Sequence, residues 1–267
     1  FEPYFHLKRR RKFAGDLAWL NAAGYTTALI AHGSDVRDPH RHIEINGKWS
    51  MYLAGDAEWR ADLARAARLH RAVAESSGSP VFYSTPDLRL DLEGGTWLPV
   101  CLDVNAWGTD APLLERAQPR ALHIPSKRTP PIKGTQFVDP VLRKLDDAGK
   151  IEYVCPESVP HSEMRSLVHD VDIVVDQLLA GSYGVAAIEA MSAGRVTVGR
   201  LAPPVLDLMP EAPPIVQATP DELEETIVAI VEDRDHYRRL GREGINFAHI
   251  WHSGKASATA LRGYLER

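Results

Sequence analysis

The sequence lacks the features that mark several specialised classes of protein. It has only two cysteines, Cys101 and Cys155, and neither belongs to a CxxC pair or to a metal-ligand spacing. This excludes a disulfide-stapled scaffold and indicates reduced thiols, which are typical of a cytoplasmic protein. No run of about 18 apolar residues is present, so no membrane-spanning helix is expected. The net charge of −5 provides no strong positive field, so nucleic acid is not an expected partner.

An initiator methionine is also missing, because the sequence begins Phe1-Glu2-Pro3-Tyr4. This start is not a signal peptide, since it has no apolar stretch and is followed by the basic run KRRRK at residues 8–12. A solvated helix face is the simplest interpretation of that run. The alternative is a weak peripheral contact with an anionic membrane surface, or with a phosphorylated molecule.

The composition is that of an ordinary globular protein. The chain has 267 residues, of which 44% are apolar and 25% charged, which excludes disorder and predicts one or two domains. Short apolar runs alternate with helical patterns, which predicts parallel sheets covered on both faces by right-handed crossovers. Strands are expected at 26–31, 81–84, within 94–100, and at 121–125, 151–155, 171–175, 196–199 and 215–218. Helices are expected at 10–23, 57–74, 133–148, 161–168, 184–193, 220–231, 235–249 and 253–266.

Two segments have little periodicity. Residues 36–53 are expected to form a surface segment, and the polar side chains Asp38, His40 and His42 within it are interpreted as solvated rather than as metal ligands. Residues 102–119 contain several Pro, Gly, Asn and Asp and are expected to be a linker. A division near residue 108 separates a first part, 1–107, from a second part, 108–267.

The most informative stretch runs from Val174 to Gly194, where an expected strand, a glycine-containing loop and a helix follow one another. Ligands of doubly wound sheets bind beyond the carboxyl ends of the strands, and backbone N–H groups at a helix start suit a diphosphate. Glu189 lies about one and a half turns into the helix, where its carboxylate can accept two ribose hydroxyls. A solvated helix residue is the alternative.

The run Tyr183-Gly184 followed by Ile188-Glu189-Ala190-Met191-Ser192-Ala193-Gly194 resembles the donor motif of the retaining, family-4-like glycosyltransferases of GT-B fold. In that family a first glutamate stands eight residues before the second. The second corresponds to Glu189, whereas the first corresponds to Gly181. The resemblance implies that the first carboxylate reads hydroxyls of the transferred sugar, so its absence leaves the sugar and the activity open. Asp176 and Gln177 are candidate substitutes.

A second match lies at residues 125–135, between an expected strand and a helix. The family has a basic residue there and a Lys-Gly pair a few residues later. Lys133 corresponds to that lysine, and either Lys127 or Arg128 to the upstream residue. The resemblance implies that both cations stabilise the departing diphosphate without a metal ion. A basic surface turn is the alternative.

A third match is the run Ala28-Leu29-Ile30-Ala31-His32-Gly33-Ser34-Asp35. The resemblance implies that His32, at the end of a strand, faces the donor sugar near the reacting centre; a structural histidine is the alternative. The segment from Pro99 to Asp103 is similar to the family's hinge between its two lobes.

Together these matches predict an α/β protein with two Rossmann-type lobes facing a cleft. Residues 1–107 would form part of an N-terminal, acceptor-side lobe, and residues 108–267 a C-terminal nucleotide-sugar lobe with terminal helices. Two complete lobes need about 300–400 residues, so opening strands with a glycine-rich turn are expected to precede this chain.

The function implied by the resemblance is a hexosyltransferase reaction, retaining and metal-independent, from a nucleoside-diphosphate sugar. The donor is a substrate, and no separate cofactor is expected; the acceptor (small molecule, glycan or lipid-linked) stays open. Phosphate or sugar would meet the loop residues Ser182, Tyr183, Gly184 and Val185, and the loop 155–161 would border the base. A nucleotide-sugar epimerase on the same fold and a non-catalytic nucleotide-sugar-binding subunit are the alternatives.

Overall fold

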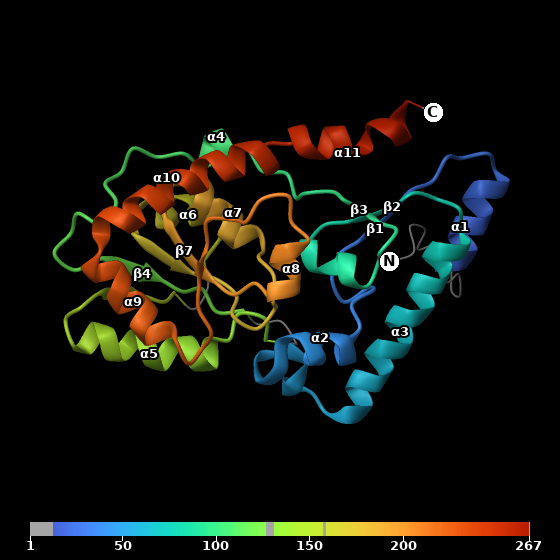
Figure 1. Cartoon of the computed structure of the whole chain (residues 1–267). Helices are drawn as coiled ribbons and strands as arrows, with labels where there is room; N and C mark the ends of the chain where they lie inside the picture. Colours follow the sequence, from blue (N-terminus) through green and yellow to red (C-terminus); the bar gives the residue numbers. More distant parts are fainter. Residues whose placement is uncertain (1–12, 127–130, 157–158, 267) are drawn as a thin grey trace.

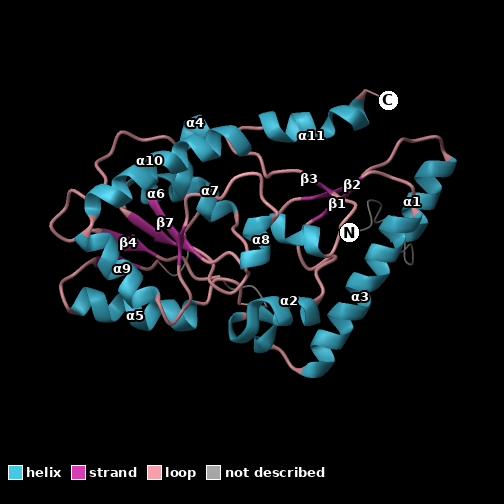
Figure 2. Cartoon of the chain, in the orientation of Figure 1, coloured by secondary structure: helices cyan, strands magenta, loops and turns pink. Residues whose placement is uncertain are grey.

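The computed structural model describes residues 13–126, 131–156 and 159–266, and these form two lobes side by side (Figures 1 and 2). The first lobe contains a parallel sheet in the order β1-β2-β3. Its strands are β1 (Leu29–Ala31), β2 (Val81–Tyr83) and β3 (Thr96–Trp97). The expected α/β class with parallel sheets is therefore confirmed.

The second lobe has a five-stranded parallel sheet in the order β5-β4-β6-β7-β8. Its strands are β4 (Arg120–Leu122), β5 (Glu152–Val154), β6 (Ile173–Val175), β7 (Val196–Gly199) and β8 (Val216–Gln217). The chain passes from β4 outward to β5 and then returns to place β6 on the other side of β4. Sheets with this order bind ligands at that switch point, beyond the carboxyl ends of the two strands.

Helices cover both faces of the second sheet (Figure 1). Ile173 and Val175 of β6 belong to one buried cluster with residues of α5 and α9, whereas Val174 between them belongs to another with residues of α6 and α7. A strand buried on both faces needs apolar side chains at every position, which explains its unbroken run of Ile and Val. The helices of this lobe are α5 (Thr135–Asp147), α6 (His161–His169), α7 (Val185–Ser192), α8 (Pro203–Asp207), α9 (Leu223–Glu232) and α10 (Arg234–Trp251).

The first lobe has fewer elements. Its helices are α1 (Phe13–Ala22), α2 (Pro39–Asn46) and α3 (Ala57–Ser76), with short 3-10 turns η1 (Gly47–Trp49), η2 (Met51–Ala54) and η3 (Pro86–Leu90). The helix α3 begins where the Asp56 side chain accepts a hydrogen bond from the Trp59 N–H, a typical helix N-cap. Its core is small, with Ala31, Tyr83 and Leu88 packed together between the sheet and η3.

Two short stretches join the lobes. The connection between the sheets contains the single-turn helix α4 (Val104–Trp107). The last helix, α11 (Lys255–Leu265), leaves α10 and extends along the first lobe (Figure 1). There the Ser257 hydroxyl donates to the Pro99 carbonyl, and the Tyr264 hydroxyl donates to the Thr26 carbonyl. The chain therefore crosses between the lobes twice.

The expectation of a surface segment at residues 36–53 is wrong. These residues form α2, η1 and η2, and Met51 and Tyr52 are buried against Leu179 and Ala180 of the second lobe. Three short helices in succession leave no helical period long enough to recognise. Their apolar partners lie about 130 residues further along the chain, where local periodicity carries no information.

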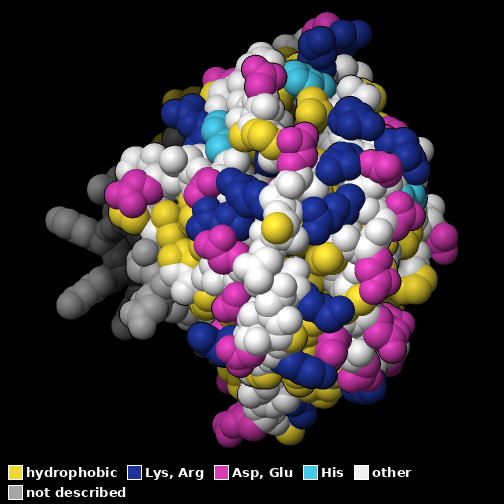
Figure 3. All heavy atoms as spheres, turned by 90° about the vertical axis from the view of Figure 1, so that its left-hand side faces the viewer, with side chains coloured by type: hydrophobic (Ala, Val, Ile, Leu, Met, Phe, Trp, Pro, Cys, Tyr) yellow, Lys and Arg dark blue, Asp and Glu magenta, His cyan; other side chains and the backbone are white. Residues whose placement is uncertain are grey.

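None of the helices in the described ranges is both long enough and apolar enough to cross a membrane. Figure 3 looks onto the second lobe from its outer side, where basic and acidic side chains are interspersed rather than gathered by sign.

Candidate active site

A cleft of about 820 Å³ lies between the two lobes. Both sheets direct the carboxyl ends of their strands toward it. The first lobe contributes residues that follow β1 and β2: His32, Gly33, Ser34, Arg37, Ser84, Thr85, Pro86 and Asp87. The second lobe contributes residues that follow β4 and β6: Pro125, Ser126, Ile132, Lys133, Asp176, Gln177, Ala180 and Ser182 to Ala186. We refer to these two sets as the first-lobe wall and the second-lobe wall.

The second-lobe wall includes the start of α7. Gly184 is the residue before the helix, and among the described residues no side chain caps the first N–H groups there. A Cβ atom on Gly184 would lie 2.9 Å from Nε2 of Gln177, which explains the glycine. Val185, the first helical residue, has a half-exposed side chain. The uncapped N–H groups together with the helix dipole suit an anionic ligand such as a phosphate.

Lys133 is held in the second-lobe wall by both its backbone and its side chain. The Leu179 N–H donates to the Ile132 carbonyl at 3.1 Å, which fixes the segment before α5 against the loop after β6. The Lys133 Nζ lies 3.2 Å from Oδ1 of the buried Asp176. The structure therefore places a positioned cation on the same wall of the cleft as the start of α7, at the switch point between β4 and β6. Lys127 and Arg128 lie outside the described residues.

Glu189 is buried in α7, and its Oε1 lies 3.7 Å from Nε2 of the exposed His161. Burial raises the pKa of Glu189, and the nearby His161 partly opposes this. His161 is the first residue of α6 and the last residue of the predicted base-binding loop 155–161, of which residues 157–158 lie outside the described ranges. The structure thus puts Glu189 beside His161, but outside the residues that line the cleft.

Of the remaining predicted site residues, some can offer a side chain to a ligand and others only their backbone. His32 is exposed at the end of β1, where its N–H donates to the Asp35 carboxylate at 3.0 Å. Tyr183 has its ring in a buried cluster and its hydroxyl 3.0 Å from Nε2 of His252. Its side chain is therefore committed to the core, and only its backbone remains for a ligand. Ser182 is 2% exposed and lines the cleft.

His252, between α10 and α11, connects this cluster to the segment between the lobes. Its Nδ1 lies 2.8 Å from the Val100 carbonyl. A carbonyl can only accept, so Nδ1 donates and Nε2 accepts from the Tyr183 hydroxyl. Burial lowers the pKa of His252 to about 4, so the ring is neutral near pH 7.

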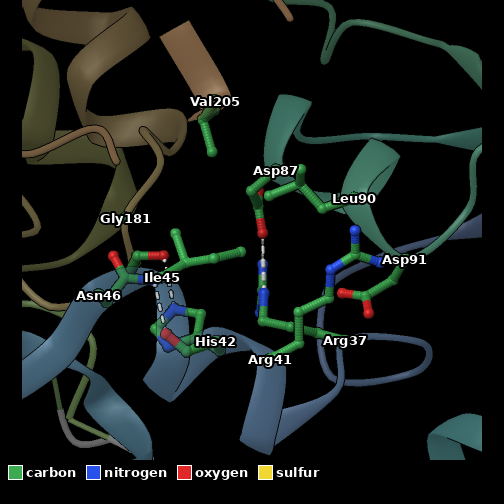
Figure 4. A pocket seen from close by; sticks show the side chains of 11 residues that line it. Arg37, Arg41, His42, Ile45, Asn46, Asp87, Leu90, Asp91, Gly181 and Val205 are labelled. Carbon is green, nitrogen blue, oxygen red and sulfur yellow. Dashed lines mark hydrogen bonds and ion pairs between the residues drawn. The ribbon is translucent and has the colours of Figure 1, made fainter. Parts of the chain in front are cut away.

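Gly181, which the sequence resemblance aligns with a glutamate, has no room for a side chain in the structure. Its φ angle is +66°, and an added Cβ would overlap the side-chain amide of Asn46 from the first lobe. Asn46 is itself fixed, since its side chain accepts from Arg200 at 2.8 Å. It also donates to the carbonyl of His42 at 3.0 Å; Figure 4 shows Asn46 beside His42 and Gly181. The two lobes therefore touch at Gly181 and Asn46.

His42 is not a solvated loop residue, and that expectation is corrected here. It lies in α2, is 5% exposed, and its Nε2 donates to the Ala180 carbonyl at 3.0 Å. Its Nδ1 accepts from the Ser50 hydroxyl at 2.7 Å. Burial lowers its pKa to about 4, with the Arg37 charge acting in the same direction. Within the described ranges, no three His, Cys, Asp or Glu side chains cluster as metal ligands would.

The first-lobe wall contains an ion pair that the sequence did not indicate. Both Nε and Nη2 of Arg37 donate to Oδ2 of Asp87, at 2.8 and 2.6 Å (Figure 4). Asp87 follows β2, which pairs with β1, the strand that His32 follows. The pair could have been anticipated, since polar residues after adjacent parallel strands meet at one edge of a sheet.

No protein-family model matches the sequence, and a comparison with well-characterised proteins finds no significant match. Solved structures are similar in fold. HepE from Anabaena in complex with UDP has a TM-score of 0.63 at 13% identity, over 95% of this chain and 76% of HepE. Its complex with UDP-glucose has a TM-score of 0.61 at 12% identity, over 95% and 77%.

Sucrose-phosphate synthase from Thermosynechococcus elongatus has a TM-score of 0.58 at 13% identity, over 93% of this chain and 75% of that protein. In all three alignments nearly the whole of this chain is matched, and so both lobes and the cleft between them are included. The chain therefore shares the two-lobed GT-B fold of these structures, as its sequence motifs predicted.

Proposed function

We propose that this protein transfers a sugar from a nucleoside-diphosphate sugar to an acceptor. The observation that carries the proposal is the pairing of Lys133 with the uncapped start of α7 on one wall of the cleft, opposite His32 on the other. A cation and free N–H groups suit the diphosphate. The complexes of HepE with UDP and UDP-glucose, which share this fold, support the same class of ligand.

In the proposed reaction an acceptor hydroxyl bonds to C1 of the sugar while the bond from C1 to the diphosphate oxygen breaks. The acceptor's proton passes to the departing phosphate oxygen, and the configuration at C1 is retained because attack and departure occur on one face. Lys133 and the N–H groups of α7 stabilise the developing negative charge. With Lys127 or Arg128 as a second cation, this task needs no metal ion.

The other predicted residues have supporting roles in this proposal. Glu189 accepts hydrogen bonds from the ribose hydroxyls, and the backbone of the loop 155–161 borders the base. Glu189 lies beside His161, at the end of that loop, which supports a shared ribose and base site. His32 faces the sugar from the first lobe. The acceptor enters from the first-lobe wall, and its chemistry is left open.

The test is to measure release of the nucleoside diphosphate from UDP-glucose, ADP-glucose and GDP-mannose, with and without a panel of glycan and lipid-linked acceptors. We expect release that depends on both a matching donor and an acceptor, with a product of retained configuration by NMR. Release with an inverted product would contradict the retaining step. Release of free nucleotide with an epimerised sugar would instead indicate the epimerase.

A non-catalytic, nucleotide-sugar-binding subunit is the second candidate. The observation that favours it is Gly181, where contact with Asn46 leaves no room for the family's first carboxylate. Tight binding of a nucleotide sugar, with no release of nucleotide on prolonged incubation with any acceptor, would support this candidate over the transferase.

A further inference from the structure

Several buried oxygen atoms in the cleft have no hydrogen-bond partner. Within the described residues, these are Oδ1 of Asp87, Oγ1 of Thr85, Oγ of Ser182 and Oδ2 of Asp176. All four residues line the cleft, and Asp87, Ser182 and Asp176 are each at most 6% exposed. Leaving a buried polar group unpaired costs free energy, so a group of them at one place indicates a missing hydrogen-bonding ligand.

The arrangement at Asp87 leaves one carboxylate oxygen without a hydrogen bond from Arg37. Both donors of Arg37 bind the same oxygen, Oδ2 (Figure 4), so Oδ1 is left without a partner among the described residues. Burial raises the pKa of Asp87, but the Arg37 charge and the nearby hydroxyls of Thr85 and Ser182 outweigh it. The carboxylate is therefore ionised and acts only as an acceptor, while the two hydroxyls can donate or accept.

Ser182 connects this group to the proposed diphosphate site. It lies two residues before Gly184, which precedes the uncapped start of α7. The sugar of a nucleotide sugar is bonded directly to the diphosphate. If the diphosphate binds at that helix start, the sugar ring therefore lies next to it, beside Ser182 and Asp87. The neighbouring Gly181 has no side chain to offer, so recognition from this direction falls to the first lobe.

We propose that Oδ1 of Asp87, with the hydroxyls of Thr85 and Ser182, binds hydroxyl groups of the donor sugar and determines which sugar is accepted. The proposal rests on the function proposed above and adds the residues that read the sugar. Arg37 is a positioning residue, since it fixes the carboxylate without touching the ligand. A site built to pair with a hydroxyl rejects an analogue without it, because its buried acceptor then stays unpaired.

The test compares binding of a nucleotide with and without its sugar. UDP, ADP and GDP, and then UDP-glucose, ADP-glucose and GDP-mannose, are titrated calorimetrically into the protein, and the best matched pair is kept. The same sugar nucleotide is then used in monodeoxy forms. We expect the protein to bind one deoxy form about 10–100-fold more weakly than the parent compound.

The variants Thr85→Val and Ser182→Ala leave the Arg37–Asp87 pair intact, so they avoid an unpaired buried charge. We expect each to weaken the sugar nucleotide about 5–20-fold, to leave the free nucleotide within twofold, and to reduce the discrimination against one deoxy form. Thr259→Val removes an exposed hydroxyl on α11 and is the matched control, with no change expected in either affinity. Asp87→Asn is compared with them if its thermal unfolding matches that of the wild type.

The experiment distinguishes failure of this inference from failure of the proposed transferase function. Equal losses for nucleotide and sugar nucleotide, or discrimination that persists in the variants, would overturn the proposal while the transferase function stands. Unchanged donor binding with a raised KM for a carbohydrate acceptor would assign the group to the acceptor, and would also overturn it. Failure of the wild type to bind any nucleotide would remove the proposed function and this inference together.

Discussion

The two walls of the cleft are built in different ways. Seven residues of one continuous segment, Asp176 to Val185, supply most of the second-lobe wall. The first-lobe wall is assembled from distant parts of the chain, since Arg37 and Asp87 are 50 residues apart. A strand, loop and helix in succession can hold an anion site alone, whereas an ion pair across two loops requires the whole lobe to be folded. We therefore expect changes in the first-lobe wall to affect stability and changes in the second-lobe wall to affect chemistry.

The largest effect on stability is expected from Arg37→Met. It leaves the Asp87 carboxylate buried without its partner, which typically costs about 3–5 kcal/mol of unfolding free energy. Urea unfolding measures the loss. Arg143→Met removes an exposed arginine from a pair with Asp139 and is the control, with little or no loss expected because solvent screens the pair.

The double variant Arg37→Met/Asp87→Leu sharpens this test. Removing both charges together should restore most of the stability, because no unpaired charge remains. If the double variant is as unstable as Arg37→Met, packing rather than charge dominates in this wall, and the contrast between the walls loses its electrostatic basis.

In the second-lobe wall, Lys133→Met should chiefly affect turnover. Loss of the cation opposite the diphosphate is expected to lower kcat by about 10²–10³-fold. Since Asp176 loses its partner as well, thermal unfolding is measured first, and rates are compared where both proteins are folded. Lys144→Met, which removes an exposed lysine paired with Glu224, should leave the rate unchanged. A rate equal to that of the wild type in Lys133→Met would exclude its assigned role.

A smaller effect is expected where the lobes meet. Gly181→Ala adds a Cβ that overlaps Asn46 and also strains a positive φ, and we expect a loss of about 2 kcal/mol. Gly78 has a φ of +68° with open space around it, so Gly78→Ala isolates the backbone part, near 1 kcal/mol. Equal losses in the two variants would mean that Asn46 moves aside freely and that the contact does not restrict residue 181.

The same contrast explains what could be predicted from the sequence. The alternation of strands and helices and the motif around Glu189 depend on neighbouring residues, so they were recognisable. The buried α2 and the pairing of Asn46 with Gly181 depend on contacts between segments more than 130 residues apart. His42 was misjudged for this reason, because its partner Ala180 belongs to the other lobe. Thr85 and Asp87 could be predicted from the sequence as site residues, since they follow a predicted strand, as His32 does.

The smallest effect concerns three buried histidines, His42, His123 and His252. The ring of His42 joins the lobes, that of His123 donates from Nδ1 to the Val175 carbonyl at 2.9 Å, and that of His252 binds the Val100 carbonyl. Burial lowers the pKa of each to about 4, below the value of about 6.5 expected in the unfolded chain. The unfolded state therefore binds more protons between these values, and the stability present above pH 6.5 is lost as the pH falls toward 4.

Each histidine should contribute a loss of about 1 kcal/mol between pH 6.5 and 5.5, measured by urea unfolding at intervals of pH. His123→Gln should reduce the number of protons taken up on unfolding by about one. The ring of His123 belongs to the second lobe alone, so this result does not depend on how the lobes separate. His42→Gln should do the same only if the two lobes unfold as one unit, since its ring joins them. If acid instead separates the lobes before either unfolds, the His42 contribution will appear as an earlier transition with its own midpoint. A stability independent of pH over this range would contradict the assignment of neutral, buried rings.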